Sequence, residues 1–294
     1  MERPLADYTI YVNGTFIPAT GSHISALDRG FALGDGAFET MRVENGRVFR
    51  LGAHLHRLRE GLRKLDITPQ HDDAALEAIV GELLTKNGLS RASVRLTVSR
   101  GIPEARGLLP GRTLGGPTLV VQAMPFAGYP DEKYATGFKA VVATIRRNET
   151  SPTAYIKTCN YLDNILVRME AAAAGADEGL MLNLTGNVAC GSVSNVFTVK
   201  GNRLHTPPVS AGILAGITRG VVMEMAARER LPVIQADLSL AELRASDEAF
   251  VTNSLMGVMP LTDLGGGPIG DGEPGPIARV LQQRYLAMVE EETR

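Results

Sequence analysis

The segment Tyr155-Ile156-Lys157-Thr158-Cys159-Asn160-Tyr161-Leu162-Asp163-Asn164 carries a lysine at the end of a short apolar run. An amphipathic helix is predicted to follow at once, with Gly175 as its stop and with apolar residues at helical spacing, namely Leu162, Ile165, Leu166 and Met169. At such a junction between a strand and a helix, the backbone that carries the lysine is rigid and the amine is partly buried. Desolvation frees the amine for Schiff-base chemistry, whereas the alternative is a solvated lysine at a surface turn.

Further blocks are spaced along nearly the whole chain, at residues 28–31, 34–43, 54–58 and 212–219. In this order, and together with the Lys157 segment, they resemble the blocks of class IV, fold-type IV pyridoxal-phosphate enzymes. That family includes branched-chain and D-amino-acid aminotransferases, (R)-amine transaminases and aminodeoxychorismate lyase. The resemblance implies an α+β, two-domain fold like that of D-amino-acid aminotransferase, with pyridoxal 5'-phosphate in the cleft between the domains. It also implies a homodimer in which a loop of the partner helps to close each site.

Composition sets limits that agree with a soluble enzyme. The chain has 294 residues, of which 44% are hydrophobic, enough for a packed core. A formal net charge of −2 shows no basic excess, so nucleic acid is not an expected partner. No apolar run is long enough for a membrane span, and no signal peptide or metal site is indicated. The two cysteines are too few for a disulfide framework, so a reduced, cytoplasmic location is expected.

The pattern along the chain predicts two domains. Residues 1–124 form a smaller α+β domain, in which Asn13-Gly14 and Asn45-Gly46 predict type I′ hairpins. Residues 125–133 read as a linker, and residues 134–294 as the larger domain that binds the cofactor. The sequence at 265–270 fits G-x-G-x-x-G, but a proline interrupts it and more loop follows. We therefore interpret it as a surface connection rather than a dinucleotide site.

A phosphate site is predicted where residues 216–219 open a helix. Free N–H groups and the positive end of the helix dipole point outward there, which makes Ile217 and Thr218 candidate phosphate donors. An ordinary capped helix is the alternative. The resemblance further implies that Arg57 binds the cofactor phosphate. The forked donors of a guanidinium match the geometry of a phosphate group. It also assigns cofactor contacts to residues of two later blocks: Ser194, Asn195, Asn253 and Ser254.

Tyr161 is a candidate for contact with the cofactor ring. It lies four residues after Lys157, so the two side chains would share a face of a continuous helix. In aminotransferases of the family a tyrosine near this place donates to the phenolic oxygen of the cofactor, and Asn160 is a weaker candidate for ring contact. The alternative for Tyr161 is a core aromatic residue with a satisfied hydroxyl.

The block at residues 186–195 departs from the family pattern at one position. The family's G-x-V-x-E-G-S-x-S-N block has a glutamate that faces the pyridine nitrogen of the cofactor and keeps it protonated. The block aligns without a gap, so Cys190 stands in its place. A neutral thiol cannot stabilise a pyridinium as a carboxylate does. Three interpretations stay open: an enzyme that needs less carbanion stabilisation, another acid at the nitrogen, or a protein that has drifted from strong catalysis.

Residues 99–107 resemble the R-G-x-x-x-R stretch of D-amino-acid aminotransferases and aminodeoxychorismate lyases, with one extra residue. In that comparison Arg106 binds the substrate carboxylate, because a guanidinium pairs with a carboxylate through two hydrogen bonds. Phe38 and Arg100 are further substrate-binding candidates. The Y-x-R pattern of branched-chain enzymes is absent from residues 94–99, so D-amino acids or (R)-amines are the expected donors.

Three functions are compatible with these features. In a transaminase, Lys157 forms the Schiff base with the cofactor and then shuttles the proton between Cα and C4′. In a lyase, the same lysine serves the release of pyruvate from aminodeoxychorismate to give 4-aminobenzoate, and residues 252–260 resemble the lyases. The third is a cofactor carrier with little turnover, which only Cys190 suggests. The transaminase is the preferred interpretation.

Overall fold

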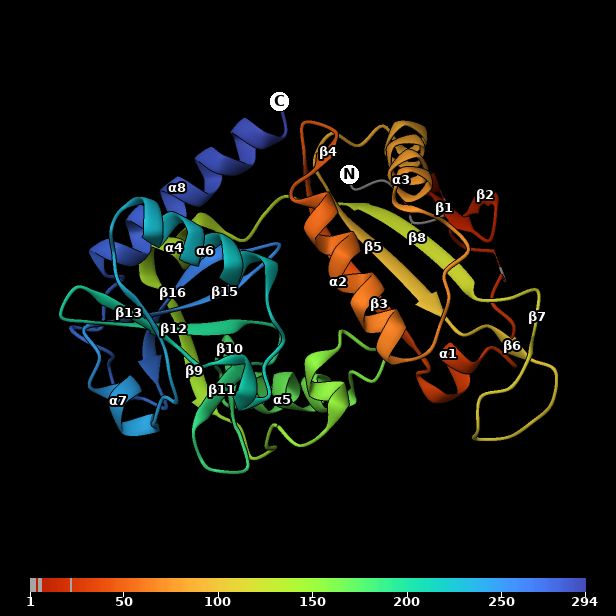
Figure 1. Ribbon diagram of the computed structural model, residues 1–294. Coiled ribbons are helices and arrows are strands. Elements are labelled where there is room, and N and C mark those ends of the chain that lie inside the picture. The colour runs from red at the N-terminus through yellow and green to blue at the C-terminus, as the bar shows by residue number, and fades with distance from the viewer. Residues whose placement is uncertain (1–3, 5–6, 22) are drawn as a thin grey trace. The chain divides into compact units, whose positions relative to one another are not determined.

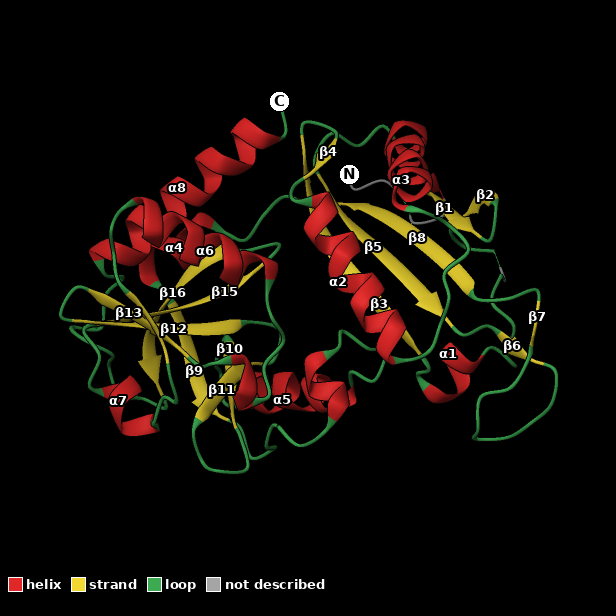
Figure 2. Ribbon diagram, in the orientation of Figure 1, coloured by secondary structure: helices red, strands yellow, loops and turns green. Residues whose placement is uncertain are grey.

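The computed structural model describes residues 4, 7–21 and 23–294, in which the chain divides into two compact units (Figure 1). Unit 1 consists of Met1–Ala127, Ile156–Asn160 and Val289–Arg294, and unit 2 of Gly128–Tyr155 and Tyr161–Met288. Each unit combines a sheet with helices, which is the α+β fold that the sequence predicts (Figure 2).

Unit 1 is built on a six-stranded sheet with the order β2-β1-β8-β5-β3-β4. Its strands are β1 (Thr9–Val12), β2 (Thr15–Pro18), β3 (Gly36–Glu44), β4 (Arg47–Val48), β5 (Ala92–Ser99) and β8 (Thr118–Pro125). A small hairpin is formed by β6 (Ile102–Pro103) and β7 (Thr113–Leu114), and the helices are α1 (Arg29–Leu33), α2 (Leu51–Lys64) and α3 (Asp73–Asn87). Both predicted Asn-Gly turns are confirmed, since all four of their residues have positive φ.

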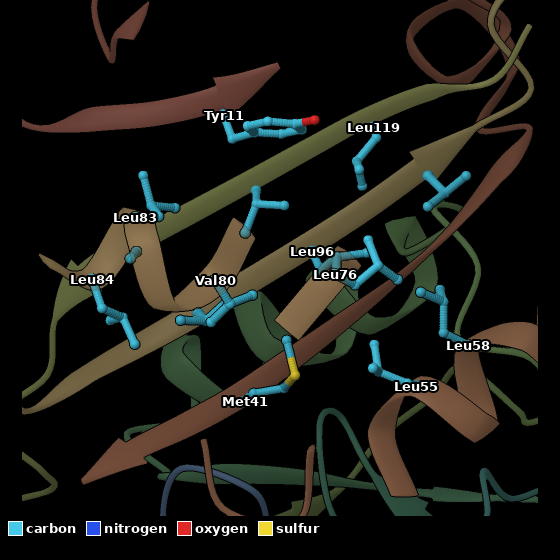
Figure 3. Close-up of a cluster of buried hydrophobic side chains, with 14 of the residues drawn as sticks. Tyr11, Met41, Leu55, Leu58, Leu76, Val80, Leu83, Leu84, Leu96 and Leu119 are labelled. Carbon is cyan, nitrogen blue, oxygen red and sulfur yellow. The ribbon is translucent and has the colours of Figure 1, made fainter. Parts of the chain in front are cut away.

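The core of unit 1 follows from the two periodicities of its sequence. Apolar residues of α2 and α3 recur every three or four residues and pack on alternate residues of the strands, as Figure 3 shows. Met41 of β3 and Leu96 of β5 are fully buried in this cluster, together with Leu55, Leu62 and Leu83.

The segment that carries Lys157 belongs to unit 1, although the chain on both sides of it belongs to unit 2. Phe38 N donates to Lys157 O at 2.9 Å and Cys159 N to Gly36 O at 2.9 Å, so the segment adds to β3 as a short strand. The sequence places it in a domain of residues 134–294, because hydrogen bonding to a distant strand leaves no local signal. The boundary near Ala127 lies within the predicted linker at 125–133.

Unit 2 has an eight-stranded sheet with the order β11-β10-β9-β16-β15-β12-β13-β14. The strands are β9 (Phe138–Val142), β10 (Glu178–Leu182), β11 (Val188–Gly191), β12 (Asn195–Lys200), β13 (Arg203–Thr206), β14 (Val233–Gln235), β15 (Glu248–Asn253) and β16 (Gly257–Leu264). The helices are α4 (Asp131–Thr136), α5 (Leu162–Ala173), α6 (Ile217–Arg228), α7 (Leu240–Arg244) and α8 (Pro276–Glu292), the last of which ends in unit 1. A pairing between β11 and β12 closes part of the sheet on itself around an apolar core. The G-x-G-x-x-G stretch lies in the loop from β16 to α8, as expected.

Helix α5 occurs where the spacing predicts it, but its large apolar residues are not the ones that are buried. It packs through Val167 and Ala171, and a Cβ on Gly179 of β10 would meet Val167 Cγ1 at 2.6 Å. Glycine therefore lets the helix lie close to the strand. The predicted apolar stripe stays exposed, by 66% at Leu162, 52% at Ile165, 42% at Leu166 and 62% at Met169.

None of the helices in the described part of the chain combines the length and the apolar character that a membrane crossing demands.

Candidate active site

Lys157 lies beside an aromatic ring and a second cation in unit 1. Its Nζ lies over the ring of Phe38, 4.4 Å from the centroid, and Cζ of Arg95 lies over the same ring at 3.7 Å. Phe38 is buried, Lys157 is half-buried and Arg95 is exposed. Phe38 and Arg95 meet because β3 pairs with β5 in a register that sets Thr40, two residues after Phe38, opposite Arg95. An amine nucleophile and a guanidinium are thus held over one rigid surface, an arrangement that attracts an anionic group to the lysine.

Arg95 is the functional candidate that sequence reasoning misses. In the sequence, residues 94–99 are notable only because they lack the Y-x-R pattern of branched-chain enzymes. The alternation of β5 carries the missing signal, because Val94, Leu96 and Val98 are buried and Arg95 points to the other face. Only the pairing of β5 with β3 shows that this face also holds Phe38.

Arg57 takes part in a buried charge cluster with Glu39 and His54. Arg57 donates from Nε to Glu39 Oε1 at 2.7 Å and from Nη2 to Oε2 at 2.7 Å, while His54 Nδ1 lies 2.7 Å from Oε2. Burial opposes ionisation of Glu39, but the hydrogen bonds from Arg57 and His54 outweigh it and lower its pKa to about 2. Burial is the main cause that lowers the pKa of His54, so a neutral ring donates to the carboxylate. The predicted contact of Arg57 with the phosphate stays a prediction, and the structure adds Glu39 as the residue that orients its guanidinium.

Arg100 has a structural partner in Asp35. It donates from Nε to Asp35 Oδ2 at 2.8 Å, and to the carbonyl oxygens of Leu65 at 2.6 Å and Asp66 at 2.9 Å. Burial would raise the pKa of Asp35, but hydrogen bonds from Arg100 and then Arg29 bring it below its usual value. These contacts hold the guanidinium at the end of β5, and its predicted role at the substrate stays a prediction.

Arg106 lies on an exposed loop between β6 and β7. The buried side chain of Arg29 holds this loop, because its Nη1 donates to Gly107 O at 2.8 Å and its Nη2 to Leu108 O at 2.9 Å. The loop is therefore anchored directly after Arg106. The predicted carboxylate contact of Arg106 stays a prediction.

The start of α6 in unit 2 has the features of an anion site. Its N-cap is Gly216, with no side-chain hydrogen bond to cap the helix, so the first N–H groups point outward. A Cβ on Gly216 would collide with Asn195 Oδ1, and Asn195 Nδ2 donates to Leu214 O at 3.0 Å. Glycine is thus required for the approach of Asn195 to the helix start. Ile217 and Thr218 follow as the first two residues of the helix.

Thr252 supplies an independent sign of a ligand at this place. It is 1% exposed, and its Oγ1 has no hydrogen-bond partner among the described residues. Thr252 pairs with Asn195 across β15 and β12, so its side chain lies beside the residue that touches the start of α6. A buried hydroxyl without a partner is costly. The orphaned hydroxyl and the uncapped helix together fit a phosphate group. Thr252 belongs to the block Thr252-Asn253-Ser254, which resembles a phosphate-contacting block of the family, although only Asn253 and Ser254 are predicted from the sequence as contact residues.

Asn253 ends β15, and Ser254 begins the turn to β16. Asn253 Oδ1 accepts from Leu255 N and Met256 N, both at 2.9 Å, and Ser254 O accepts from Tyr285 at 3.3 Å. The side chain of Asn253 therefore shapes the turn. Its predicted cofactor contact and that of Ser254 stay predictions.

Thr252→Val is expected to affect the empty protein and the cofactor complex in opposite directions. Removal of an unsatisfied buried hydroxyl should stabilise the apoprotein by about 1 kcal/mol. Loss of a hydrogen bond to a charged phosphate should weaken cofactor binding by about 1.5–3 kcal/mol, roughly tenfold or more in Kd. Thermal unfolding of the apoprotein and a titration with pyridoxal phosphate measure the two effects.

The matched control is Thr262→Val, which removes a buried hydroxyl that donates to Thr136 O at 3.0 Å. This change should destabilise the apoprotein and leave the affinity for the cofactor unchanged. Unaltered cofactor affinity in Thr252→Val would contradict the assignment of Thr252 to the phosphate site.

Cys190 lies on β11 and is 7% exposed. Burial raises the pKa of its thiol to about 11, so the group is neutral. The hydroxyl of the nearby Ser194 donates to Glu178 Oε2 at 2.8 Å, and its predicted cofactor contact stays a prediction. Glu178 also accepts from the N–H and hydroxyl of Ser192, and is itself buried. This carboxylate is therefore saturated with internal donors.

Arg147 connects the two loops that lead to the site residues. It donates from Nε to Gly212 O at 2.8 Å, ahead of α6, and from Nη2 to Ala154 O at 2.7 Å, ahead of Lys157. Its charge also favours the ionised form of Cys190, but less than burial disfavours it. Arg147 is thus a cation in the surroundings of Cys190.

The expected helical relation between Lys157 and Tyr161 is wrong. Helix α5 begins at Leu162, and Tyr161 is its N-cap with φ −113° and ψ 13°. Lys157 lies before the helix in the segment that pairs with β3, so a spacing of four residues does not set the two side chains on one face. The predicted contact of Tyr161 with the cofactor stays a prediction.

Comparison with known proteins places these features in a family. Residues 36–264 match the amino-transferase class IV family. The aminodeoxychorismate lyase of Bacillus subtilis is 33% identical over 259 residues, which cover 87% of this chain and 86% of the lyase. The D-alanine aminotransferase of Listeria innocua is 29% identical over 280 residues, 94% of each chain. The branched-chain aminotransferase of the archaeon Thermoproteus uzoniensis, solved with norvaline, superposes with a TM-score of 0.87 at 28% identity, over 97% of each chain. The chain belongs to the class IV aminotransferases, whose cofactor is pyridoxal phosphate.

Proposed function

We propose that this protein is a transaminase that moves an amino group between an amino acid and a 2-oxo acid. The observation that carries the proposal is the position of Lys157 Nζ and the Arg95 guanidinium over the ring of Phe38. Bound pyridoxal phosphate supplies the carbonyl that takes up the amino group and a ring that withdraws charge from Cα. Lys157 holds the cofactor and moves the proton at Cα.

Arg95 suits substrates that carry a carboxylate. A guanidinium can donate two parallel hydrogen bonds to a carboxylate, which fixes the orientation of the substrate and balances its negative charge. The guanidinium of Arg95 lies over the ring of Phe38, with Cζ 3.7 Å from the centroid, which favours a fixed position for this cation. An amine without a carboxylate gains nothing from this contact, so the geometry favours amino acids over (R)-amines as donors.

Arg95→Leu is the experiment that tests this proposal. With amino-acid donors, kcat/KM should fall about 10- to 100-fold, chiefly through KM, because a charge-assisted hydrogen bond contributes about 1.5–3 kcal/mol. With an aliphatic amine as donor, the variant and the wild type should react alike. The control is Arg91→Leu, which removes an exposed arginine paired with Glu44 at the other end of the strand. Equal losses with amino acids and amines would contradict the proposed contact.

For the stereochemistry of the donor we propose D-amino acids. The R-G-x-x-x-R-like stretch at 100–106 and the likeness to the D-alanine aminotransferase support this choice. The likeness to the Thermoproteus uzoniensis enzyme supports L-branched-chain amino acids instead. A screen of the holoenzyme with single D- and L-amino acids distinguishes the two kinds of donor. The readout is the loss of the absorbance of the bound cofactor. If L-leucine and L-valine are the best donors, the proposed stereochemistry is wrong.

A second candidate function is the release of pyruvate from aminodeoxychorismate. The likeness to the lyase of Bacillus subtilis and the resemblance of residues 252–260 to the lyases favour it. Such a lyase needs no 2-oxo acid as acceptor. Pyruvate formation from aminodeoxychorismate without an added 2-oxo acid would therefore favour the lyase over the transaminase.

We further propose that the protein is a homodimer that associates through the exposed face of α5. Leu162, Ile165, Leu166 and Met169 form a continuous apolar stripe on this helix. Exposed apolar patches of this kind mark interaction surfaces, and two-fold homodimers are the commonest assemblies of soluble proteins.

Two glutamates in the α5 stripe, Leu162→Glu with Met169→Glu, should convert the dimer to a monomer because they bury charge at the contact. Light scattering after gel filtration measures the mass. Leu286→Glu, at an exposed apolar residue of α8, is the control and should leave the mass unchanged. A dimer that persists in the double variant would exclude α5 as the interface.

A further inference from the structure

Cys190, Asn195 and Thr252 form a row across three neighbouring strands of unit 2. Cys190 pairs with Asn195, and Asn195 pairs with Thr252. Residues directly opposite one another place their side chains on the same face of a sheet. The flanking residues Val196 and Val251 point into the apolar core, so Asn195 and Thr252 point away from it.

This row runs from the phosphate site to the thiol. Adjacent strands lie about 5 Å apart, so Cys190 lies about 10 Å from Thr252. If Thr252 and the start of α6 held the phosphate, the pyridine ring of the cofactor would extend along this row toward Cys190. The thiol then lies at the end of the row that is far from the phosphate.

The charged groups around Cys190 do not replace the missing carboxylate. Glu178 is saturated by the hydroxyl and N–H groups of Ser192, the hydroxyl of Ser194 and its neighbour's N–H. Its carboxylate also lies beside Gly191, since a Cβ there would meet Glu178 Oε2 at 2.7 Å. Because successive residues of a strand point to opposite faces, Glu178 is on the other side of β11 from the Cys190 thiol. The remaining neighbour, Arg147, is a cation.

We infer that the ring nitrogen of bound pyridoxal phosphate faces Cys190 and is unprotonated in this enzyme. A buried pyridinium needs an anionic partner, and Cys190 offers a neutral thiol with a cation nearby. The ring then withdraws less charge from Cα than a protonated ring does. This inference deepens the proposed function at the same site. It rests on the cofactor and not on amino transfer, so a protein that binds pyridoxal phosphate without transferring amino groups would refute only the proposed function.

The test is the ¹⁵N chemical shift of the ring nitrogen in holoenzyme loaded with ¹⁵N-labelled pyridoxal phosphate. The wild type should give the resonance of a free pyridine, and Cys190→Ser, a neutral control of similar size, should do the same. Cys190→Glu should move the resonance upfield to that of an N-protonated reference, because a carboxylate at this position would give the ring nitrogen an anionic partner. Cys190→Asp carries the same charge on a smaller side chain and serves if the glutamate variant does not fold.

A protonated ring nitrogen in the wild type would overturn the inference. So would a free-pyridine resonance in a folded, cofactor-bound acidic variant, because Cys190 would then not be the neighbour of the nitrogen. The wild-type spectrum decides the protonation state by itself, and the acidic variants decide which residue faces it.

Discussion

Lys157→Ala is expected to lower turnover by roughly a thousandfold or more. The change removes both the amine that holds the cofactor and the group that moves the proton at Cα, and a positioned acid–base group alone contributes about 10²–10⁴-fold. The backbone of the segment, which pairs with β3, should keep its place because its hydrogen bonds come from main-chain atoms. The measurement is kcat with a good donor, beside thermal unfolding of the apoprotein.

The covalent link to Lys157 can be mapped directly. Borohydride reduction of the holoenzyme followed by peptide mass analysis should place the pyridoxyl group on Lys157. Lys200→Ala is the control, because Lys200 is an exposed lysine paired with Asp247 and should lose no activity. A pyridoxyl group on any lysine other than Lys157 would refute the assignment.

Glu39→Gln is expected to destabilise the fold by about 3 kcal/mol at neutral pH. The pKa of Glu39 falls from 4.5 to about 2 in the folded protein, and a pKa change of one corresponds to about 1.4 kcal/mol. The variant leaves the guanidinium of Arg57 without its counter-charge at a buried site. Urea unfolding of the apoprotein measures the change. Glu60→Gln removes the partner of Arg63 on an exposed helix face and should have little effect.

The same cluster predicts a particular dependence of stability on pH. Because the folded pKa of Glu39 is lower than its unfolded value, its contribution is complete above pH 4.5 and is lost as the pH falls toward 2. The wild type should therefore lose stability in this window more steeply than Glu39→Gln. Parallel pH profiles of the two proteins would show that Glu39 is not ionised in the folded state.

Some functional positions follow from local sequence. Asn13-Gly14 and Asn45-Gly46 adopt positive φ, as the two central residues of a type I′ turn require, so their hairpins can be predicted from two residues each. The spacing of the leucines in α2 places Arg57 off the buried stripe. The partner of Arg57, however, is Glu39, eighteen positions away on β3. No local pattern encodes a hydrogen bond between a helix and a strand, so the charge cluster appears only in the folded chain.

The family, the position of the candidate Schiff-base lysine and the helix start that offers N–H groups can be predicted from the sequence, because these depend on residue identity and on spacing within single elements. The tertiary structure decided which side chains meet. Pairing of β3 with β5 sets Arg95 on Phe38, and pairing of β12 with β11 and β15 sets Cys190, Asn195 and Thr252 in one row. It also decided that the large apolar residues of α5 stay exposed, since Gly179 admits the small face of the helix. The packing of the whole core determines the register between distant strands and the face through which a helix packs. A short stretch of sequence therefore does not predict either of them.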